Sequence, residues 1–480
     1  MLKKAIQKWK QMPLSAKSFT ANTVCRMLQR SLALITMPLF TRLLTTTEYG
    51  QYNVYMAWTA IFSIFITLNL SEGSFATAMV RYEDSRDKYV AAVQNIGLVF
   101  GLVFLALYLP FRKVLNPLLE MPTAFVILMV AEIIGQHCLS CWQRVKQFDY
   151  KYKQVIAMTT LSTVAMPVLA YLLVINSEEK GYARVLGYAM VAVIIGSVLY
   201  IRGLIKGKGG LKKEYWKYAL LFNIPLIPYY LSQVVFNQSD RIMISHYFGT
   251  DKAGIYSLAY TLSMIFTFLI NAVDSCYVPW LYRMYKEGKE KETRNVSVGL
   301  SAVVAFILMG VIALAPEIIG IMAGQAYMEA IWVVPPVTIS LLLMYYTRLL
   351  VNVEFYYEKK TMMVWSAVGS AILNVVLNML LLPKFGFLAA GYTTLVSYAV
   401  LTVANYFAVR KLAKQQSFDM ATFDLKGLLG ILSALTILSA IAMALYAYPI
   451  ARFAIIGVVF LGLGIFHKRV IAFVKTLLKR

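Results

Sequence analysis

The chain has 480 residues, of which 60% are hydrophobic and only 14% are charged, and its mean hydropathy is +0.66. Soluble domains carry roughly 25% charged residues, so this composition excludes a water-soluble globule. In a soluble protein, a net charge of +23 would indicate nucleic-acid binding. Here the basic residues lie in short segments between apolar runs, which is typical of the positive-inside rule in membrane proteins. We therefore expect no nucleic-acid partner.

The N-terminal segment, residues 1–17, lacks the apolar core and cleavage site of a signal peptide. Ile6 and Trp9 lie among four lysines, which predicts an interfacial helix on an anionic membrane surface. The four cysteines all fall within apolar stretches, and this predicts buried free thiols. Cys138 and Cys141 form a C-x-x-C pair without the second pair that a zinc site needs, so we expect no bound metal.

Fourteen apolar runs follow, and a transmembrane helix needs about 20 such residues. The runs cover residues 18–43, 52–80, 89–111, 121–143, 155–175, 183–204, 217–247, 255–281, 297–315, 328–352, 362–382, 387–409, 428–447 and 451–467. The expected fold class is an all-α polytopic membrane protein with fourteen transmembrane helices.

The distribution of basic residues predicts the orientation of these helices. If the N-terminus is cytoplasmic, 35 of the 46 Lys and Arg residues lie in inner segments, nine lie in outer loops and two lie inside the first span. Inner loops of membrane proteins carry the excess of Lys and Arg. We therefore expect both termini inside.

A shift of 204 residues aligns two parts of the chain. Residues 46–52 (TTEYGQY) fall on residues 250–256 (TDKAGIY), and Phe62 falls on Phe266. Spans 1–6 thus look like a copy of spans 7–12, and an even number of spans makes the repeat parallel. We expect a six-helix bundle over residues 1–206, a second bundle over 207–426, and two appended helices in 427–480.

Several short segments resemble one transporter family. They are DRIMI at 240–244, FG at 248–249, AGIYSLA at 253–259, LFTRLL at 39–44, EYG at 48–50, LPKFG at 382–386 and AAG at 389–391. In combination they resemble the polysaccharide-exporter branch of the multidrug/oligosaccharidyl-lipid/polysaccharide flippase superfamily.

The resemblance implies a Wzx-type flippase in the bacterial cytoplasmic membrane. Its substrates would be undecaprenyl-diphosphate-linked oligosaccharides destined for O-antigen, capsule or exopolysaccharide. It implies alternating access of two bundles in a V shape, without ATP or another cofactor, and the coupling ion, Na⁺ or H⁺, stays open. Membrane lipids, a polysaccharide polymerase and glycosyltransferases are the expected partners, and one chain is expected to suffice as a monomer.

Span 1 carries the strongest candidates for substrate binding. Asn22, Arg26 and Arg30 recur every four residues and share one helix face, with Gln29 beside them. Burying an arginine in lipid costs ~2.5–3.5 kcal/mol on insertion scales, and guanidinium groups match phosphate bidentately. We expect Arg26 and Arg30 to line a cationic cavity and bind the diphosphate. The alternative is an ion pair with Glu72 or Glu132.

Six further charged residues are candidates for coupling or gating: Glu72, Glu132, Asp274, Asp240, Arg241 and Arg348. Each also has a structural alternative. Asp274 follows Asn271 by one turn and could make interhelical hydrogen bonds. Asp240 and Arg241 point apart on a helix, so each could pair with another helix at an outer gate. Arg348 could form an inner gate with Glu354.

The alternatives are a lipid II flippase, a cation-coupled multidrug exporter and a membrane enzyme. A lipid II flippase also has fourteen spans and a cationic cavity, so topology does not separate it. A cation-coupled multidrug exporter of the same superfamily has twelve spans and acidic cavity residues. A membrane enzyme such as a polysaccharide polymerase needs a sizeable outer loop, whereas the connecting segments here reach only about twenty residues. We expect no enzyme.

Overall fold

The computed structural model describes residues 13–359, 361–454 and 457, and within them the chain is helical, with no β-strand. The long helices are α2 (Leu14–Leu43), α3 (Thr46–Thr67), α5 (Arg86–Leu119), α6 (Thr123–Phe148), α7 (Tyr152–Ile175), α8 (Lys180–Lys206), α10 (Ile227–Phe248), α11 (Thr250–Ile265), α12 (Thr267–Lys286), α13 (Thr293–Ala313), α15 (Val334–Tyr356), α16 (Thr361–Phe385), α17 (Ala389–Gln416) and α18 (Leu425–Ala444). Shorter helices are α4 (Phe75–Arg81), α9 (Lys213–Asn223) and α14 (Ala315–Met322).

Eleven helical segments within this described part are long and apolar enough to cross a membrane. The chain is therefore a multi-pass membrane protein, as predicted. Helices α2 and α3 occupy the first two predicted spans but are not among the eleven, and α2 carries the charges of Arg26 and Arg30. Most of the last predicted span, 451–467, and most of the predicted N-terminal interfacial helix lie outside the described residues. The count of fourteen and the cytoplasmic termini stay predictions.

The second predicted span, 52–80, is wrong as one continuous helix. Helix α3 ends at Thr67, Leu68 and Asn69 adopt left-handed backbone conformations, and α4 begins only at Phe75. Asn223 of α9 supports this turn, since its amide donates to Ser74 Oγ at 2.7 Å. The segment Asn69-Leu70-Ser71-Glu72-Gly73-Ser74 is rich in loop-forming residues, which explains the break.

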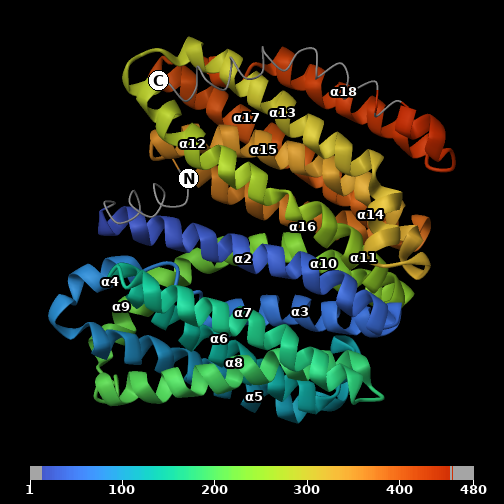
Figure 1. The fold of residues 1–480 in the computed structure, drawn as a ribbon. Helices are drawn as coiled ribbons and strands as arrows, with labels where there is room; N and C mark the ends of the chain where they lie inside the picture. Colours follow the sequence, from blue (N-terminus) through green and yellow to red (C-terminus); the bar gives the residue numbers. More distant parts are fainter. Residues whose placement is uncertain (1–12, 360, 455–456, 458–480) are drawn as a thin grey trace, which may run out of the picture. The chain divides into compact units, whose positions relative to one another are not determined.

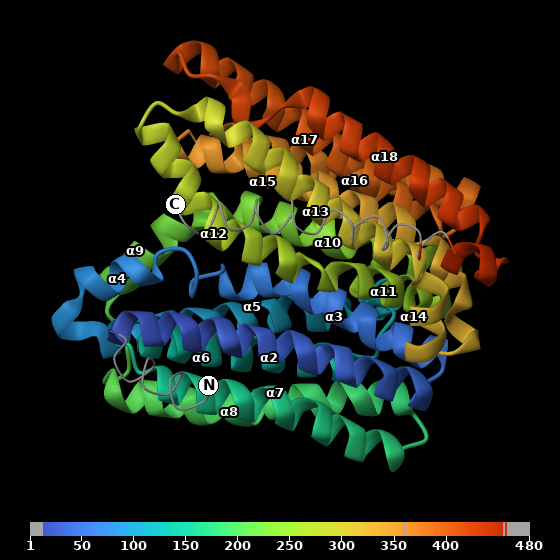
Figure 2. The same cartoon turned by 45° about the horizontal axis from the view of Figure 1, so that its top comes forward.

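The chain divides into two compact units. The first contains residues 1–258, 322–326 and 364–393, and the second contains 259–321, 327–363 and 394–480. In the first unit α6 and α7 pack along α8, α2 packs along α7, and α10 packs along α3 (Figure 1). In the second unit α13 lies against α15 and α18, and α12 lies against α13 and α15 (Figure 2). The predicted division at 206 and 426 rests on internal similarity, which this packing does not test.

The two copies of the repeated motif lie against one another within the first unit. Helix α3 begins at Thr46 and α11 begins at Thr250, the residue that the 204-residue shift places on Thr46. A Cβ atom on Gly50 would overlap the carbonyl oxygen of Thr250, and a Cβ on Gly254 would overlap that of Thr46. The contact is therefore reciprocal, and it needs glycine in both copies because backbone meets backbone.

The cysteine prediction is correct for three thiols and wrong for one. Cys25, Cys138 and Cys141 are buried and free, whereas Cys276 is exposed on α12. The apolar run around Cys276 therefore did not indicate which side of α12 is packed against other helices.

Candidate functional site

Helix α2 carries the residues predicted to bind substrate. It is continuous from Leu14 to Leu43, so Asn22, Arg26 and Arg30 occupy successive turns of one helix. The side chains of these three residues lie outside the described part of the structure. Gln29 is exposed on the same helix. Substrate binding by this face stays a prediction.

Glu72 lies in the turn after α3 and pairs with Arg144 near the end of α6. Its side chain is half exposed, so the ion pair lies at the surface of the first unit, where such pairs contribute little to stability. This position differs from the predicted one inside a span, because the helix ends at Thr67.

A polar cavity of about 340 Å³ lies between α3 and α6. Glu72 lies at its rim and Glu132 lines it, together with the hydroxyl groups of Thr59, Ser63, Thr67, Ser71 and Ser140. Glu132 is buried and accepts a hydrogen bond of 2.8 Å from the hydroxyl of Tyr55 on α3. His137, also at this cavity, lies 3.2 Å from the carbonyl oxygen of Val93. The carboxyl of Glu132 is thus held between two helices.

Asp240 on α10 is fully buried at the centre of a hydrogen-bonded network. Tyr256 of α11 donates to one carboxylate oxygen and Asn378 of α16 donates to the other, at 2.5 Å each. Thr393 donates to the Asn378 side-chain oxygen, and Asn378 also reaches Asn374 Oδ1 at 3.4 Å. A buried carboxylate needs such partners, since an unpaired one is costly. The network joins four helices, α10, α11, α16 and α17, around one acidic group.

Arg241, the next residue along α10, points away from this network. Its guanidinium donates to the carbonyl oxygen of Asn237 at 2.9 Å and to the side chain of Gln238. Adjacent helical residues face different directions. Asp240 bonds to other helices, as the sequence suggested, whereas these two hydrogen bonds of Arg241 stay within α10.

Arg348 on α15 contacts α12 in the second unit. Its Nη1 atom donates to Asp274 Oδ2 at 2.9 Å and to Asn271 Oδ1 at 2.6 Å. The Arg348 side chain is 36% exposed and that of Asp274 is 17% exposed. The structure therefore places Arg348 beside Asp274, where the sequence suggested Glu354 as its partner.

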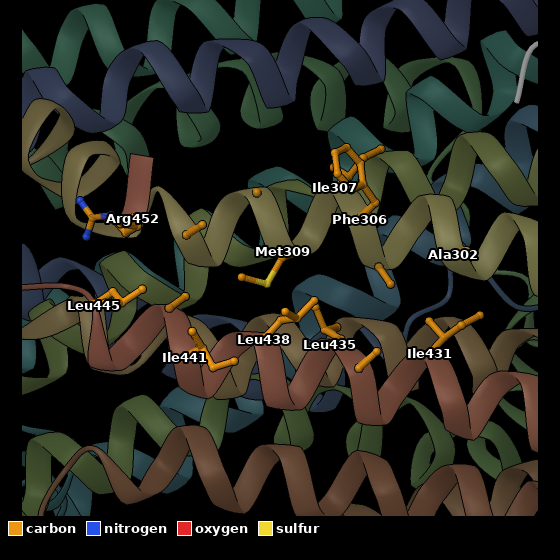
Figure 3. Close-up of a pocket in the computed structure, with 15 residues that line it drawn as sticks. Ala302, Phe306, Ile307, Met309, Ile431, Leu435, Leu438, Ile441, Leu445 and Arg452 are labelled. Atoms are coloured by element: carbon orange, nitrogen blue, oxygen red, sulfur yellow. The ribbon is translucent and has the colours of Figure 1, made fainter. Parts of the chain in front are cut away.

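An apolar groove of about 520 Å³ runs between α13 and α18 (Figure 3). Met309 of α13 faces Leu435 and Leu438 of α18 across it, and Arg452 lies at one end. Arg452 is buried and pairs with Glu317 of α14. A groove lined in this way suits an apolar chain rather than a polar ligand.

Sequence reasoning missed Arg184, which is buried near the start of α8. Its guanidinium carbon lies 3.8 Å from the ring centre of Tyr52, 4.3 Å from Phe40 and 4.9 Å from Tyr49. Cation–π contacts of this kind stabilise a desolvated arginine by about 2 kcal/mol. The sequence feature that could have revealed Arg184 is its position as an arginine at the edge of an apolar run. In the structure Arg184 joins α2, α3 and α8 around one charge.

Comparison with protein families and curated proteins identifies relatives in polysaccharide synthesis. The model of the family described as "Polysaccharide biosynthesis protein" matches residues 15–285. The capsular polysaccharide biosynthesis protein CapF of Staphylococcus aureus is 20% identical over 82% of this chain and 99% of its own length. The Lsg locus putative protein 1 of Haemophilus influenzae is 22% identical over 71% of this chain and 84% of its own length.

Solved structures with a similar fold are membrane transporters. The lipid II flippase MurJ, in an inward closed conformation, matches with a TM-score of 0.70 at 14% identity, over 93% of this chain and 99% of that one. A multidrug resistance MATE transporter in an inward-facing conformation matches with a TM-score of 0.61 at 11% identity, over 83% and 98%. An outward-facing MATE transporter matches with a TM-score of 0.53 at 10% identity, over 85% and 98%. At these identities the similarity concerns the fold.

Proposed function

The chain belongs to the polysaccharide biosynthesis protein family, and from that premise we propose that it flips undecaprenyl-diphosphate-linked oligosaccharides across the bacterial cytoplasmic membrane. The observation that carries the proposal is the family match over residues 15–285, in a chain whose fold is that of membrane flippases and exporters. The product would serve the synthesis of a surface polysaccharide such as capsule, O-antigen or exopolysaccharide.

The proposed mechanism is alternating access of two bundles around a cationic cavity. Its support is that MATE transporters of similar fold were solved in both inward-facing and outward-facing conformations. In the proposal Arg26 and Arg30 bind the diphosphate, since two guanidinium groups suit its charge and its oxygen geometry, and Asn22 and Gln29 add hydrogen bonds. The apolar groove between α13 and α18 is the candidate path for the isoprenoid chain.

Coupling is proposed at Asp240, with Na⁺ or H⁺ as the driving ion. Hard cations take oxygen ligands, and the network around Asp240 supplies a carboxylate, the side-chain oxygens of Asn374 and Asn378, and the Thr393 hydroxyl. Both Asp240 oxygens accept hydrogen bonds, from Tyr256 and from the Asn378 amide nitrogen, so a cation would have to displace these donors, and the same carboxylate could instead hold a proton. An ion bound there would neutralise the buried charge and link α10 to α16.

The Asp240→Asn variant tests the coupling proposal. An amide carries no charge, so we expect transport by this variant to lose its dependence on the Na⁺ gradient or on external pH. Asp424→Asn, which removes a carboxylate paired with Arg294, is the control and should keep the dependence of the parent protein. An Asp240→Asn protein with unchanged ion dependence would exclude this site.

Deletion of the gene in its host tests the function itself. We expect undecaprenyl-diphosphate-linked glycans to accumulate while one surface polysaccharide disappears, because the substrate is made inside and used outside. The mass of the accumulated glycan then identifies the sugar unit. Unchanged levels of both would contradict the proposal.

Lipid II transport is the second candidate, and the similarity in fold to MurJ favours it. The same deletion separates the two functions. Accumulation of lipid II with arrested cell-wall synthesis would indicate a lipid II flippase, whereas accumulation of another lipid-linked glycan indicates the polysaccharide branch.

A further inference from the structure

Helix α12 exposes an unusual surface for a helix inside a membrane-spanning segment. Its exposed residues at the middle are Asn271, Ala272, Ser275 and Cys276. In the described part of the chain no large hydrophobic side chain is exposed between Phe268 and Ile321. By contrast, α16 exposes Ile372, Val376, Met379 and Leu380. The Arg348–Asp274 ion pair on this face is partly exposed, and charged groups are costly against the hydrocarbon chains of lipid, so this face is suited to water or a polar ligand.

The polar centre of this face is the cluster of Asn271, Asp274 and Arg348. One nitrogen of Arg348 binds both α12 side chains, at 2.6 Å and 2.9 Å, and the Arg348 side chain remains 36% exposed. The ion pair has no net charge. Strong binding of a diphosphate uses uncompensated cations, so this cluster is a poor match for the charged part of a lipid-linked substrate. Carboxylate, amide and guanidinium together supply both acceptors and donors, which is what neutral hydroxyl groups require.

An aromatic pair lies further along the same two helices. Tyr282 of α12 and Tyr356 of α15 have ring centres 5.4 Å apart, and both rings are partly exposed. Tyr282 follows Asp274 by eight residues on α12, and Tyr356 follows Arg348 by eight residues on α15. Since Asp274 contacts Arg348 and Tyr282 contacts Tyr356, the two helices run in parallel. At ~1.5 Å per residue the aromatic pair lies about 12 Å from the polar cluster. Aromatic rings offer an apolar face on which sugar rings stack.

We infer that the α12–α15 face of the second unit binds the glycan part of the substrate, with Asn271, Asp274 and Arg348 contacting sugar hydroxyls and Tyr282 and Tyr356 stacking on a sugar ring. The inference rests on the proposed function and assigns glycan recognition to residues other than the arginines of α2. It gives the protein a surface that distinguishes one sugar unit from another.

Binding to two probes tests this assignment. The full chain in lipid nanodiscs is titrated with undecaprenyl diphosphate alone and with the lipid-linked oligosaccharide purified from a host lacking the gene. We expect Asn271→Ala and Arg348→Gln to weaken binding of the glycan-bearing probe by about tenfold, the worth of one or two hydrogen bonds, and to leave binding of undecaprenyl diphosphate unchanged. Arg294→Gln, which breaks the exposed Arg294–Asp424 pair of the same unit, should leave both affinities unchanged.

Equal weakening of both probes in the variants would overturn the glycan assignment and leave the flippase proposal standing. A parent protein that binds neither probe would overturn the flippase proposal as well.

Discussion

At the scale of single residues, three buried or half-buried arginines are stabilised in different ways. Arg184 lies among aromatic rings, Arg452 pairs with Glu317, and Arg348 pairs with Asp274 while its guanidinium stays partly exposed. A charge inside a membrane protein is costly, so each needs compensation. The Arg348 side chain is 36% exposed, whereas those of Arg184 and Arg452 are buried, which is why Arg348 is assigned to substrate.

Substitution of Arg30 tests the predicted diphosphate contact. We expect Arg30→Ala to insert in the membrane at normal levels and to lose transport, because the charge is removed. Arg30→Lys should retain part of the activity, since a lysine keeps the charge but cannot bind two phosphate oxygens in a planar fork. Restoration of surface polysaccharide in the deletion host is the measurement. Full complementation by Arg30→Ala would show that this residue does not bind substrate.

The candidate site was only partly predictable at this scale. A charge within an apolar run is visible in a sequence, so Asp240, Asp274 and Arg348 could be found. Their partners could not, because Asn378 is 138 residues from Asp240 and Asp274 is 74 residues from Arg348. Such distant pairs depend on how the helices pack.

At the scale of helices, the contact between the starts of α3 and α11 is the feature most sensitive to substitution. Gly50→Ala would force its Cβ against the Thr250 backbone, and overpacking of this kind costs about 1–3 kcal/mol. We expect a lower midpoint of thermal unfolding in detergent. Gly430→Ala in α18 is the matched control, because no atom lies within 4 Å of the added Cβ. It should stabilise by roughly 0.5–1 kcal/mol through helix propensity. A Gly50→Ala protein as stable as its parent would contradict the observed packing.

The sequence predicted where helices lie more accurately than where each helix begins and ends. The repeat predicted that residues 46 and 250 are equivalent, and both begin helices. The break after Thr67 was missed because the predicted apolar run continues through residues 69–74, although this segment contains Asn, Ser and Gly, which favour a turn. A run of apolar residues specifies burial in lipid or protein, and it does not by itself specify an uninterrupted helix.

At the scale of the whole molecule, orientation in the membrane is a prediction that can be measured. Single cysteines are placed at Ser177, between α7 and α8, and at Gly288, between α12 and α13, in a background without native cysteines. The predicted topology puts Ser177 outside and Gly288 inside. A membrane-impermeant maleimide should label Ser177→Cys in intact cells and Gly288→Cys only after permeabilisation. The reverse pattern would overturn the cytoplasmic placement of the termini.

The fold class was predictable because composition and the spacing of apolar runs determine that a chain is a helical membrane protein. The number of spans was less predictable than the fold class. Helix α2 is a long helix with basic residues within it, so its apolar character alone does not identify it as a span. The substrate is less predictable still, since it depends on side chains from helices that are distant in the sequence.

We propose that this chain alone moves lipid-linked oligosaccharides across a membrane. The direct test is to reconstitute the purified protein into vesicles that contain the oligosaccharide lipid in both leaflets, and to measure how much glycan is accessible to a membrane-impermeant glycan-oxidising reagent. We expect the accessible fraction to rise from half to nearly all with the protein present, and to stay at half in protein-free vesicles and with Arg30→Ala. Accessibility that stays at half with the parent protein, with or without a Na⁺ or proton gradient, would contradict the account.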